Sequence, residues 1–145
     1  MPQRVIAIDL GARRIGVAVT DGLGITAQPH STIPRRGGQR DLEAIAAVVR
    51  AQDAGRVVLG LPLDPDGEHG RAARSVEAFA ARLRAALDVP VELIDESFTT
   101  VEAEDVLLQA DLSRARRKEV VDRVAAAVIL RRWLDAEAAR KRREL

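Results

Sequence analysis

Four acidic side chains lie where apolar segments end or begin, which is where they could do chemistry. Asp9 lies near the end of the apolar run VIAIDL, and Asp95 and Glu96 close the run VELIDE. Strand side chains alternate between two faces, so at most one of Asp95 and Glu96 can share a site with Asp9. The fourth acid, Asp122, follows the segment KEVV. A site of three carboxylates is therefore predicted, with its middle member left open.

The position of Asp122 on a helical wheel supports this prediction. At 100° per residue its nearest neighbours are Ala126, Ile129 and Trp133, so Asp122 projects from an apolar stripe. Taken singly, each acid also has a structural interpretation. An Asp at a strand end caps turns, and an acid near a helix start interacts with the helix dipole.

A cluster of three carboxylates needs protons or cations. Two unit charges 4 Å apart repel by about 4 kcal/mol at an effective dielectric near 20. The chain has no cysteine and only two histidines, so hard oxygen ligands remain, and these select Mg²⁺ or Mn²⁺. Two such ions can activate a water and stabilise the leaving oxygen of a phosphodiester, and no side-chain general base is then required.

Composition limits the class of protein. The 145 residues suit one domain, expected over residues 1–145, with the charged tail from about residue 137 frayed. The sequence shows neither a long apolar run nor a signal peptide, and with no cysteine we expect a cytoplasmic protein without membrane association. Because 23 basic residues nearly balance 22 acidic ones, attraction for a polyanion must be local.

The elements that position these acids follow from the hydrophobic pattern. Strands are expected at residues 4–10 and 15–20, joined by the turn GARR, and at about 25–33, 55–61 and 89–96. Helices are expected at 41–50, from residue 71 onward, at about 100–109 and at about 118–136. The order predicts an α/β fold, with a five-stranded mixed sheet of an antiparallel three-strand meander followed by parallel strands with crossover helices.

Four segments in this order resemble the YqgF family, also called the RuvX or Holliday-junction-resolvase family. The segments are AIDLGARRIGVAVTD, VVLGLPLDPDGEHG, LIDESFTTVEA and KEVVDRVAAAVIL, so the resemblance covers nearly the whole chain. It implies an RNase H-like fold and a nuclease whose acidic triad falls on Asp9, Glu96 and Asp122. Family members usually carry Arg where this chain has Ser97 and Asn where it has Asp64.

The resemblance implies a nucleic-acid substrate. The role assigned to the family is trimming of the 5′ end of precursor 16S ribosomal RNA, and resolution of branched DNA is the older proposal. Basic and loop residues near the predicted carboxylate site are candidates for phosphate contacts, which position a nucleic acid without reading its sequence. These candidates are Arg13, Arg14, His69, Arg71, Arg114, Arg116, Arg117 and Lys118.

Two other functions stay open at this level. The Asp and Gly of the segment Asp9-Leu10-Gly11, followed by a hairpin, also resemble the first phosphate motif of the actin, hexokinase and Hsp70 ATPases. Those proteins hold nucleotide between two lobes, whereas 145 residues suit one lobe and no second segment of this kind is seen. A catalytically idle module that binds RNA or protein is the second alternative. Junction resolution would further require a homodimer, because two strands need two facing active sites.

Overall fold

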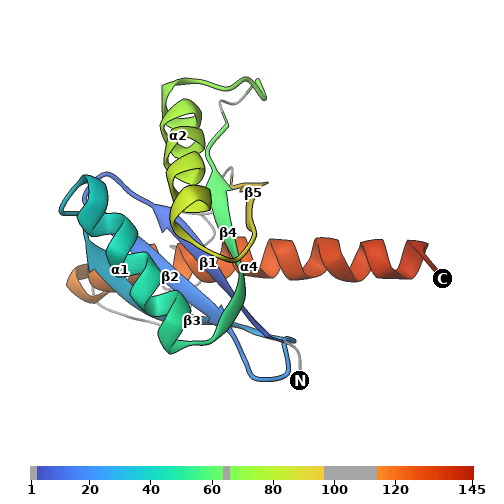
Figure 1. Ribbon diagram of the computed structural model, residues 1–145. Helices are drawn as coiled ribbons and strands as arrows, with labels where there is room; N and C mark the ends of the chain where they lie inside the picture. Colours follow the sequence, from blue (N-terminus) through green and yellow to red (C-terminus); the bar gives the residue numbers. More distant parts are fainter. Residues whose placement is uncertain (1–2, 64–65, 97–113) are drawn as a thin grey trace.

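Five strands form one mixed sheet in the order β3-β2-β1-β4-β5 (Figure 1). The computed structural model describes residues 3–63, 66–96 and 114–145, and the side chains of the last helix from residue 120 onward. The five-stranded mixed sheet confirms the fold class predicted from sequence, although the third strand begins two residues later than expected. The strands are β1 (Arg4–Leu10), β2 (Arg14–Thr20), β3 (Ala27–Pro34), β4 (Ala54–Leu61) and β5 (Val91–Asp95).

The strand directions bring three strand ends to one edge of the sheet. β1 pairs antiparallel with β2, and β2 pairs antiparallel with β3. β1 and β4 are parallel, as are β4 and β5. The carboxyl ends of β1, β4 and β5 therefore lie at the same edge, where Asp9 and the LIDE segment were predicted to meet.

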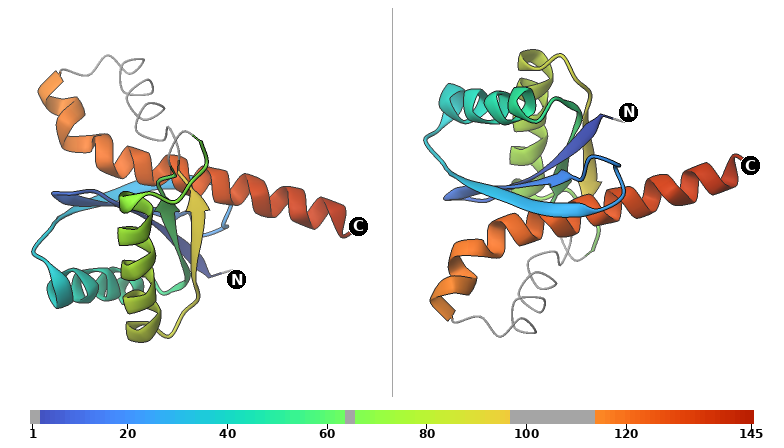
Figure 2. Two further views of the ribbon diagram at one scale, coloured as in Figure 1. Left: turned by 90° about the horizontal axis from the view of Figure 1, so that it is seen from above. Right: turned by 90° about the horizontal axis from the view of Figure 1, so that it is seen from below.

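Helices cover both faces of the sheet (Figure 2). α1 (Gly38–Ala51) and α2 (Arg71–Ala86) pack on one face, and α4 (Arg114–Arg143) crosses the other. Alternation along β1 sends Ile6 and Ile8 into the core under α1 and α2, and sends Ala7 toward α4. Asp9 has the same parity as Ala7, so it lies on the α4 face of the sheet.

The final helix is longer than the sequence pattern predicted. It starts at Arg114 rather than at residue 118, and it continues to Arg143, past the predicted end at about residue 136. The tail stays helical because it is rich in strong helix formers and because Arg140 pairs with both Glu137 and Glu144 at helical spacing.

The helix predicted at 100–109 lies outside the described residues. In the described part of the chain, no helix has the combined length and apolar character that crossing a membrane requires.

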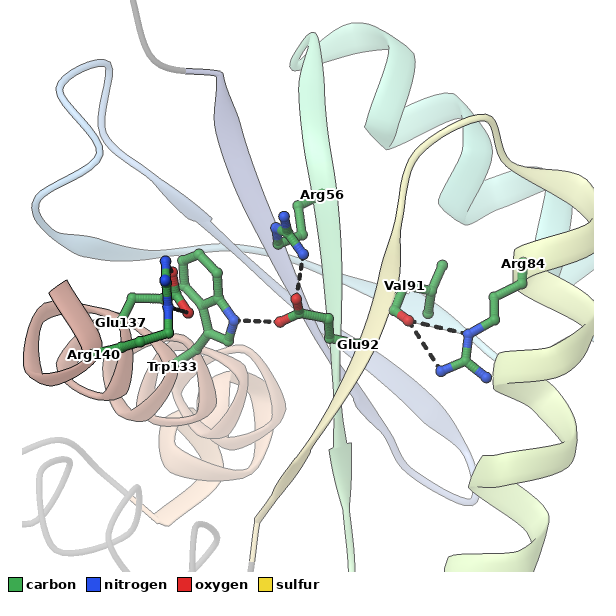
Figure 3. A network of polar contacts seen from close by, with 7 residues as sticks. All are labelled: Arg56, Arg84, Val91, Glu92, Trp133, Glu137 and Arg140. Atoms are coloured by element: carbon green, nitrogen blue, oxygen red, sulfur yellow. Dashed lines mark hydrogen bonds and ion pairs between the residues drawn. The ribbon is translucent and has the colours of Figure 1, made fainter. Parts of the chain in front are cut away.

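A polar network fixes α4 against the strands β4 and β5 (Figure 3). The indole Nε1 of Trp133 donates a hydrogen bond of 2.6 Å to Glu92 on β5. Arg56 on β4 forms an ion pair with Glu92, and its guanidinium carbon lies 5.8 Å from the centroid of the Trp133 ring. These contacts hold the helix that carries Asp122 in one position on the sheet.

At Gly16 the backbone of α4 lies directly on β2. A Cβ built on Gly16 would lie 2.0 Å from the carbonyl oxygen of Asp122. This distance is far below van der Waals contact, and the obstacle is backbone rather than a flexible side chain. Only glycine lets the helix approach β2 this closely at this point.

A buried carboxylate ties the start of α1 to the turn between β1 and β2. Asp41 is 1% exposed and accepts hydrogen bonds from Arg35 Nε at 2.8 Å and from the backbone N–H groups of Arg36 and Gly37. Arg35 in turn donates from Nη1 to the carbonyl oxygen of Gly11 at 2.7 Å. Burial alone would raise the pKa of Asp41, but the hydrogen bonds from the Arg36 backbone and the Arg35 guanidinium outweigh it and lower the pKa.

We predict that Gly16→Ala destabilises the protein by about 2–3 kcal/mol, because the added methyl group forces α4 away from the sheet. Urea unfolding measures this loss. Gly22→Ala is the matched control, since a Cβ at Gly22 would meet only Arg4 Nη2, at 3.9 Å, and should change stability little. Equal stability of the two variants would contradict the close approach of α4.

We predict that Asp41→Asn lowers the free energy of unfolding by about 2 kcal/mol at neutral pH, because it removes the charge that Arg35 and two N–H groups stabilise. The folded-state pKa of Asp41 is lowered, so its contribution is fully present above the ordinary value of 3.8 and is lost as pH falls through the folded-state pKa. The difference between wild type and variant should therefore shrink below about pH 4. Glu43→Gln, an exposed site on the same helix, should show no such trend.

Candidate functional site

Asp9 occupies the centre of the sheet edge where the predicted acids meet. It lies one residue before the end of β1 and pairs in register with Gly16 of β2. Because Gly16 has no side chain, the α4 backbone at Asp122 lies above that position. The register and the helix approach together bring Asp122 beside Asp9, although the two lie 113 positions apart in the sequence.

A second glycine admits Glu96 to the same place. The backbone N–H of Glu96 donates to the carbonyl of Leu61 at 3.1 Å, so this residue extends the pairing of β5 with β4. A Cβ on Gly60 would lie 2.6 Å from Glu96 Oε2 and 2.9 Å from Glu96 Cβ. The side chain of Glu96 thus crosses β4 over Gly60 and reaches Asp9. Asp95 has the opposite parity on β5, so of the two adjacent acids it is Glu96 that meets Asp9.

The environment of Asp9 disfavours its negative charge. Burial raises the pKa of Asp9 above its ordinary value of 3.8. A hydrogen bond from the Glu96 carboxyl opposes this rise, and the negative charge of Asp122 adds to it. The net effect is a raised pKa, which is the expected result when carboxylates converge without enough positive charge among them.

Among the described contacts of the cluster is one between a cation and Asp122. Arg14 Nε lies 2.6 Å from Asp122 Oδ2, a charge-assisted hydrogen bond between the start of β2 and α4. The Asp122 side chain is 19% exposed and that of Arg14 is 47% exposed. The site therefore contains an acid pair, Asp9 with Glu96, and an ion pair, Arg14 with Asp122.

The donor chemistry of the cluster fits a hard divalent cation. Its three carboxylates come from three separate elements, and burial together with the negative charge of Asp122 raises the pKa of Asp9, which a bound cation would offset. Within residues 3–63, 66–96 and 114–145, however, no three His, Asp or Glu side chains are grouped closely enough to enclose a metal ion. Asp122 is engaged by Arg14 instead, so the carboxylates are assembled but are not yet arranged around one point.

The other predicted contact residues lie in different settings. The Arg13 side chain is exposed in the turn between β1 and β2, and Arg71 is exposed at the first position of α2. His69 Nδ1 lies 2.7 Å from Glu77 Oε1, which gives this histidine a structural partner on α2. Arg114, Arg116, Arg117 and Lys118 lie in the first turns of α4, although a loop over 110–117 was expected before a helix starting at about 118, and their side chains are outside the described part. Ser97 and Asp64 also lie outside it.

Sequence reasoning missed the two glycines that make the site possible. Gly16 and Gly60 are interior residues of β2 and β4, where glycine weakens a strand. An isolated glycine inside a strand pattern indicates close approach of another group, and this pattern was visible in IGVAVT and VVLGL. The contact of Arg14 with Asp122 had no such pattern, because it joins residues 108 positions apart.

Two solved structures with this fold contain Holliday junction DNA. One is similar to this protein with a TM-score of 0.57 and 18% identity, over 94% of this chain and 96% of the other, and is described as T. thermophilus RuvC in complex with Holliday junction substrate. The Fowlpox virus resolvase bound to junction DNA gives a TM-score of 0.56 and 10% identity, over 92% of this chain and 97% of that one. At these identities the likeness establishes the fold alone.

Relatives at higher identity share nearly the full length. A protein of Myxococcus xanthus named "Putative pre-16S rRNA nuclease" is 51% identical over 133 residues, which are 92% of this chain and 88% of the relative. A protein of Pelotomaculum thermopropionicum with the same name is 46% identical over 142 residues, 97% of this chain and 92% of the relative. Residues 3–136 match the RuvX family, described as Holliday junction resolvase. This chain therefore belongs to the RuvX family.

Proposed function

We propose that this protein is a nuclease that hydrolyses phosphodiester bonds of RNA and acts in 5′-end maturation of precursor 16S ribosomal RNA. The observation that carries the proposal is the convergence of Asp9, Glu96 and Asp122 on one edge of the sheet. The names of the Myxococcus and Pelotomaculum relatives support an RNA substrate. The absence of cysteine from the chain agrees with a reducing compartment, so we place the activity in the cytoplasm.

The carboxylates of Asp9, Glu96 and Asp122 are the groups that would hold Mg²⁺ or Mn²⁺. When two such ions are bound, they supply an activated water and stabilise the negative charge of the leaving oxygen. Asp9 lies between the other two acids. In this proposal it would therefore interact with both metal ions. Glu96 is held in reach by Gly60, and Asp122 by the contact of α4 with Gly16.

The remaining residues of the site bind rather than react. Arg14 at the edge of the cluster presents a guanidinium that suits the oxygens of a phosphate. Arg13 extends the same basic turn, and the basic start of α4 from Arg114 to Lys118 would contact the backbone of a longer substrate. Because His69 is paired with Glu77, we assign it no role as a general base.

Branched DNA is the second candidate substrate, and the description of the RuvX family favours it specifically. Cutting a four-way junction symmetrically requires two sites that face two strands, which implies a homodimer. The RNA function makes no such demand. The two substrates therefore differ both in the product formed and in the oligomeric state that the reaction needs.

We predict that the protein cleaves labelled single-stranded RNA in Mg²⁺ or Mn²⁺ but not in EDTA, and that Asp9→Asn lowers the rate at least about 100-fold. Loss of a residue that merely orients a metal ligand already costs 10–100-fold, and loss of the ligand itself should cost more. The rate is measured from the appearance of shortened labelled RNA on a sequencing gel. A four-way DNA junction assayed in parallel ranks the two substrates.

Asp135→Asn is the matched control for this assay, because Asp135 is an exposed Asp on α4, the helix that carries Asp122. Its rate should equal that of wild type, whereas Asp122→Asn should match Asp9→Asn. Cleavage that survives Asp9→Asn would remove the carboxylate site from the mechanism. Binding of RNA without cleavage in any cation would instead identify an idle binding module.

We predict that Asp9→Asn stabilises the protein in EDTA at neutral pH. The folded-state pKa of Asp9 is raised, so stability is greatest while Asp9 is neutral and falls as pH rises through the folded-state pKa. The advantage of the variant should therefore grow as pH rises above about 4, until pH passes the folded-state pKa. Chemical unfolding of both proteins across this range measures the difference.

Divalent cation should reverse this order. Mn²⁺ at 100 times its Kd stabilises a folded protein by about 2.7 kcal/mol, so wild type should gain this amount and Asp9→Asn should gain much less. Equal gains for the two proteins would mean that the cation binds elsewhere on the surface.

A further inference from the structure

The guanidinium of Arg14 contacts Asp122, one of the three acids proposed to bind a metal cation. Its Nε lies 2.6 Å from Asp122 Oδ2, whereas Asp9 and Glu96 are joined to each other. A carboxylate oxygen that accepts a hydrogen bond from a guanidinium at this distance has its charge compensated. A divalent cation that binds Asp122 through Oδ2 therefore competes with Arg14 for this oxygen.

We propose that Arg14 is a positioning residue that competes with the divalent cation for Asp122 and is drawn away by a substrate phosphate, so that nucleic acid and metal bind cooperatively. This inference rests on the proposed nuclease function and adds a role for Arg14 that phosphate binding alone does not include. In the protein without substrate the ion pair keeps the carboxylates from closing around one point. With substrate present, the same guanidinium contacts the phosphate and Asp122 joins Asp9 and Glu96.

The turn that carries Arg14 is built to hold its backbone while the side chain moves. The backbone N–H of Arg35 donates to the Arg13 carbonyl at 2.9 Å, and its guanidinium binds the Gly11 carbonyl and the buried Asp41. Arg14 also begins β2 and pairs with Pro34 of β3. Its side chain is nearly half exposed, so its guanidinium can exchange partners without movement of the strand.

In this exchange Arg14 keeps an anionic partner throughout, first the carboxylate of Asp122 and then a substrate phosphate. A guanidinium donates to a phosphate in the same bidentate geometry as to a carboxylate, so the residue loses one anionic partner and gains another. Asp122 likewise exchanges one cation for another. Since coupling between two ligands is reciprocal, bound nucleic acid must raise the metal affinity by the same factor as bound metal raises the nucleic-acid affinity.

The first test measures Mn²⁺ affinity without nucleic acid, by the electron paramagnetic resonance signal of free Mn²⁺. Arg14→Gln should bind Mn²⁺ about tenfold more tightly than wild type, because a competing positive charge is removed from Asp122. Arg14→Lys retains the charge and should stay near wild type. Arg13→Gln makes the same change of charge one residue away and should also stay near wild type, which separates the specific contact from a general effect of charge.

The second test repeats the titration with a short phosphorothioate single-stranded RNA bound. Mn²⁺ affinity of wild type should rise by about tenfold, whereas Arg14→Gln, which is already released from competition, should gain much less. The double variant Arg14→Gln with Asp122→Asn should lose the tighter binding seen in Arg14→Gln. Circular dichroism of each variant establishes that it is folded.

The outcomes separate this inference from the proposed function. If wild type and Arg14→Gln bind Mn²⁺ equally and RNA changes both equally, Arg14 does not compete and the inference fails, while the nuclease proposal stands. If Arg14→Gln binds Mn²⁺ more weakly than wild type, Arg14 supports the metal site and the inference is reversed. If no variant binds Mn²⁺, the metal-dependent function itself fails, and the inference fails with it.

Discussion

The negative charge of Asp9, held at the edge of a buried sheet, is the constraint on which the rest of the site depends. Burial and the neighbouring Asp122 both raise the pKa of this carboxyl, and a hydrogen bond from Glu96 only partly offsets them. A folded protein tolerates such a residue when its charge has a use, since an apolar residue in its place would remove the cost. The proposed binding of a divalent cation by Asp9, Glu96 and Asp122 would give this charge such a use.

Space for this arrangement comes from two missing side chains. Gly16 and Gly60 flank the β1 strand on its two neighbours, and each gives up its side-chain position to an acid-bearing segment. Gly16 admits the backbone of α4 at Asp122, and Gly60 admits the side chain of Glu96. Glycine in a strand interior weakens the strand. At both positions this loss of stability accompanies the close approach of an acid to Asp9.

The long helix α4 connects the stability of the fold to the geometry of the site. Trp133 and the Glu92–Arg56 pair fix the helix near its middle, eleven residues beyond Asp122, on the same face of the sheet. At the opposite side of β1, the buried Asp41 and Arg35 hold the turn from which Arg14 extends. Two anchors on different elements thus set the distance between Arg14 and Asp122.

The sequence by itself determined the mixed sheet, the strand that places Asp9 at its edge, and the membership of Asp122 in an apolar helix stripe, because these follow from local periodicity. It did not determine the extent of α4. Helix propensity and the pairs of Arg140 with Glu137 and Glu144 stabilise the helix beyond residue 136, where the pattern predicted its end. The residue pattern left Asp95 and Glu96 open and the family resemblance favoured Glu96, but the physical reason lies in the tertiary structure, in the register of β5 against β4 and the empty position at Gly60. The pairing of Arg14 with Asp122 was likewise beyond the sequence, because it is a contact between distant segments that local patterns do not encode.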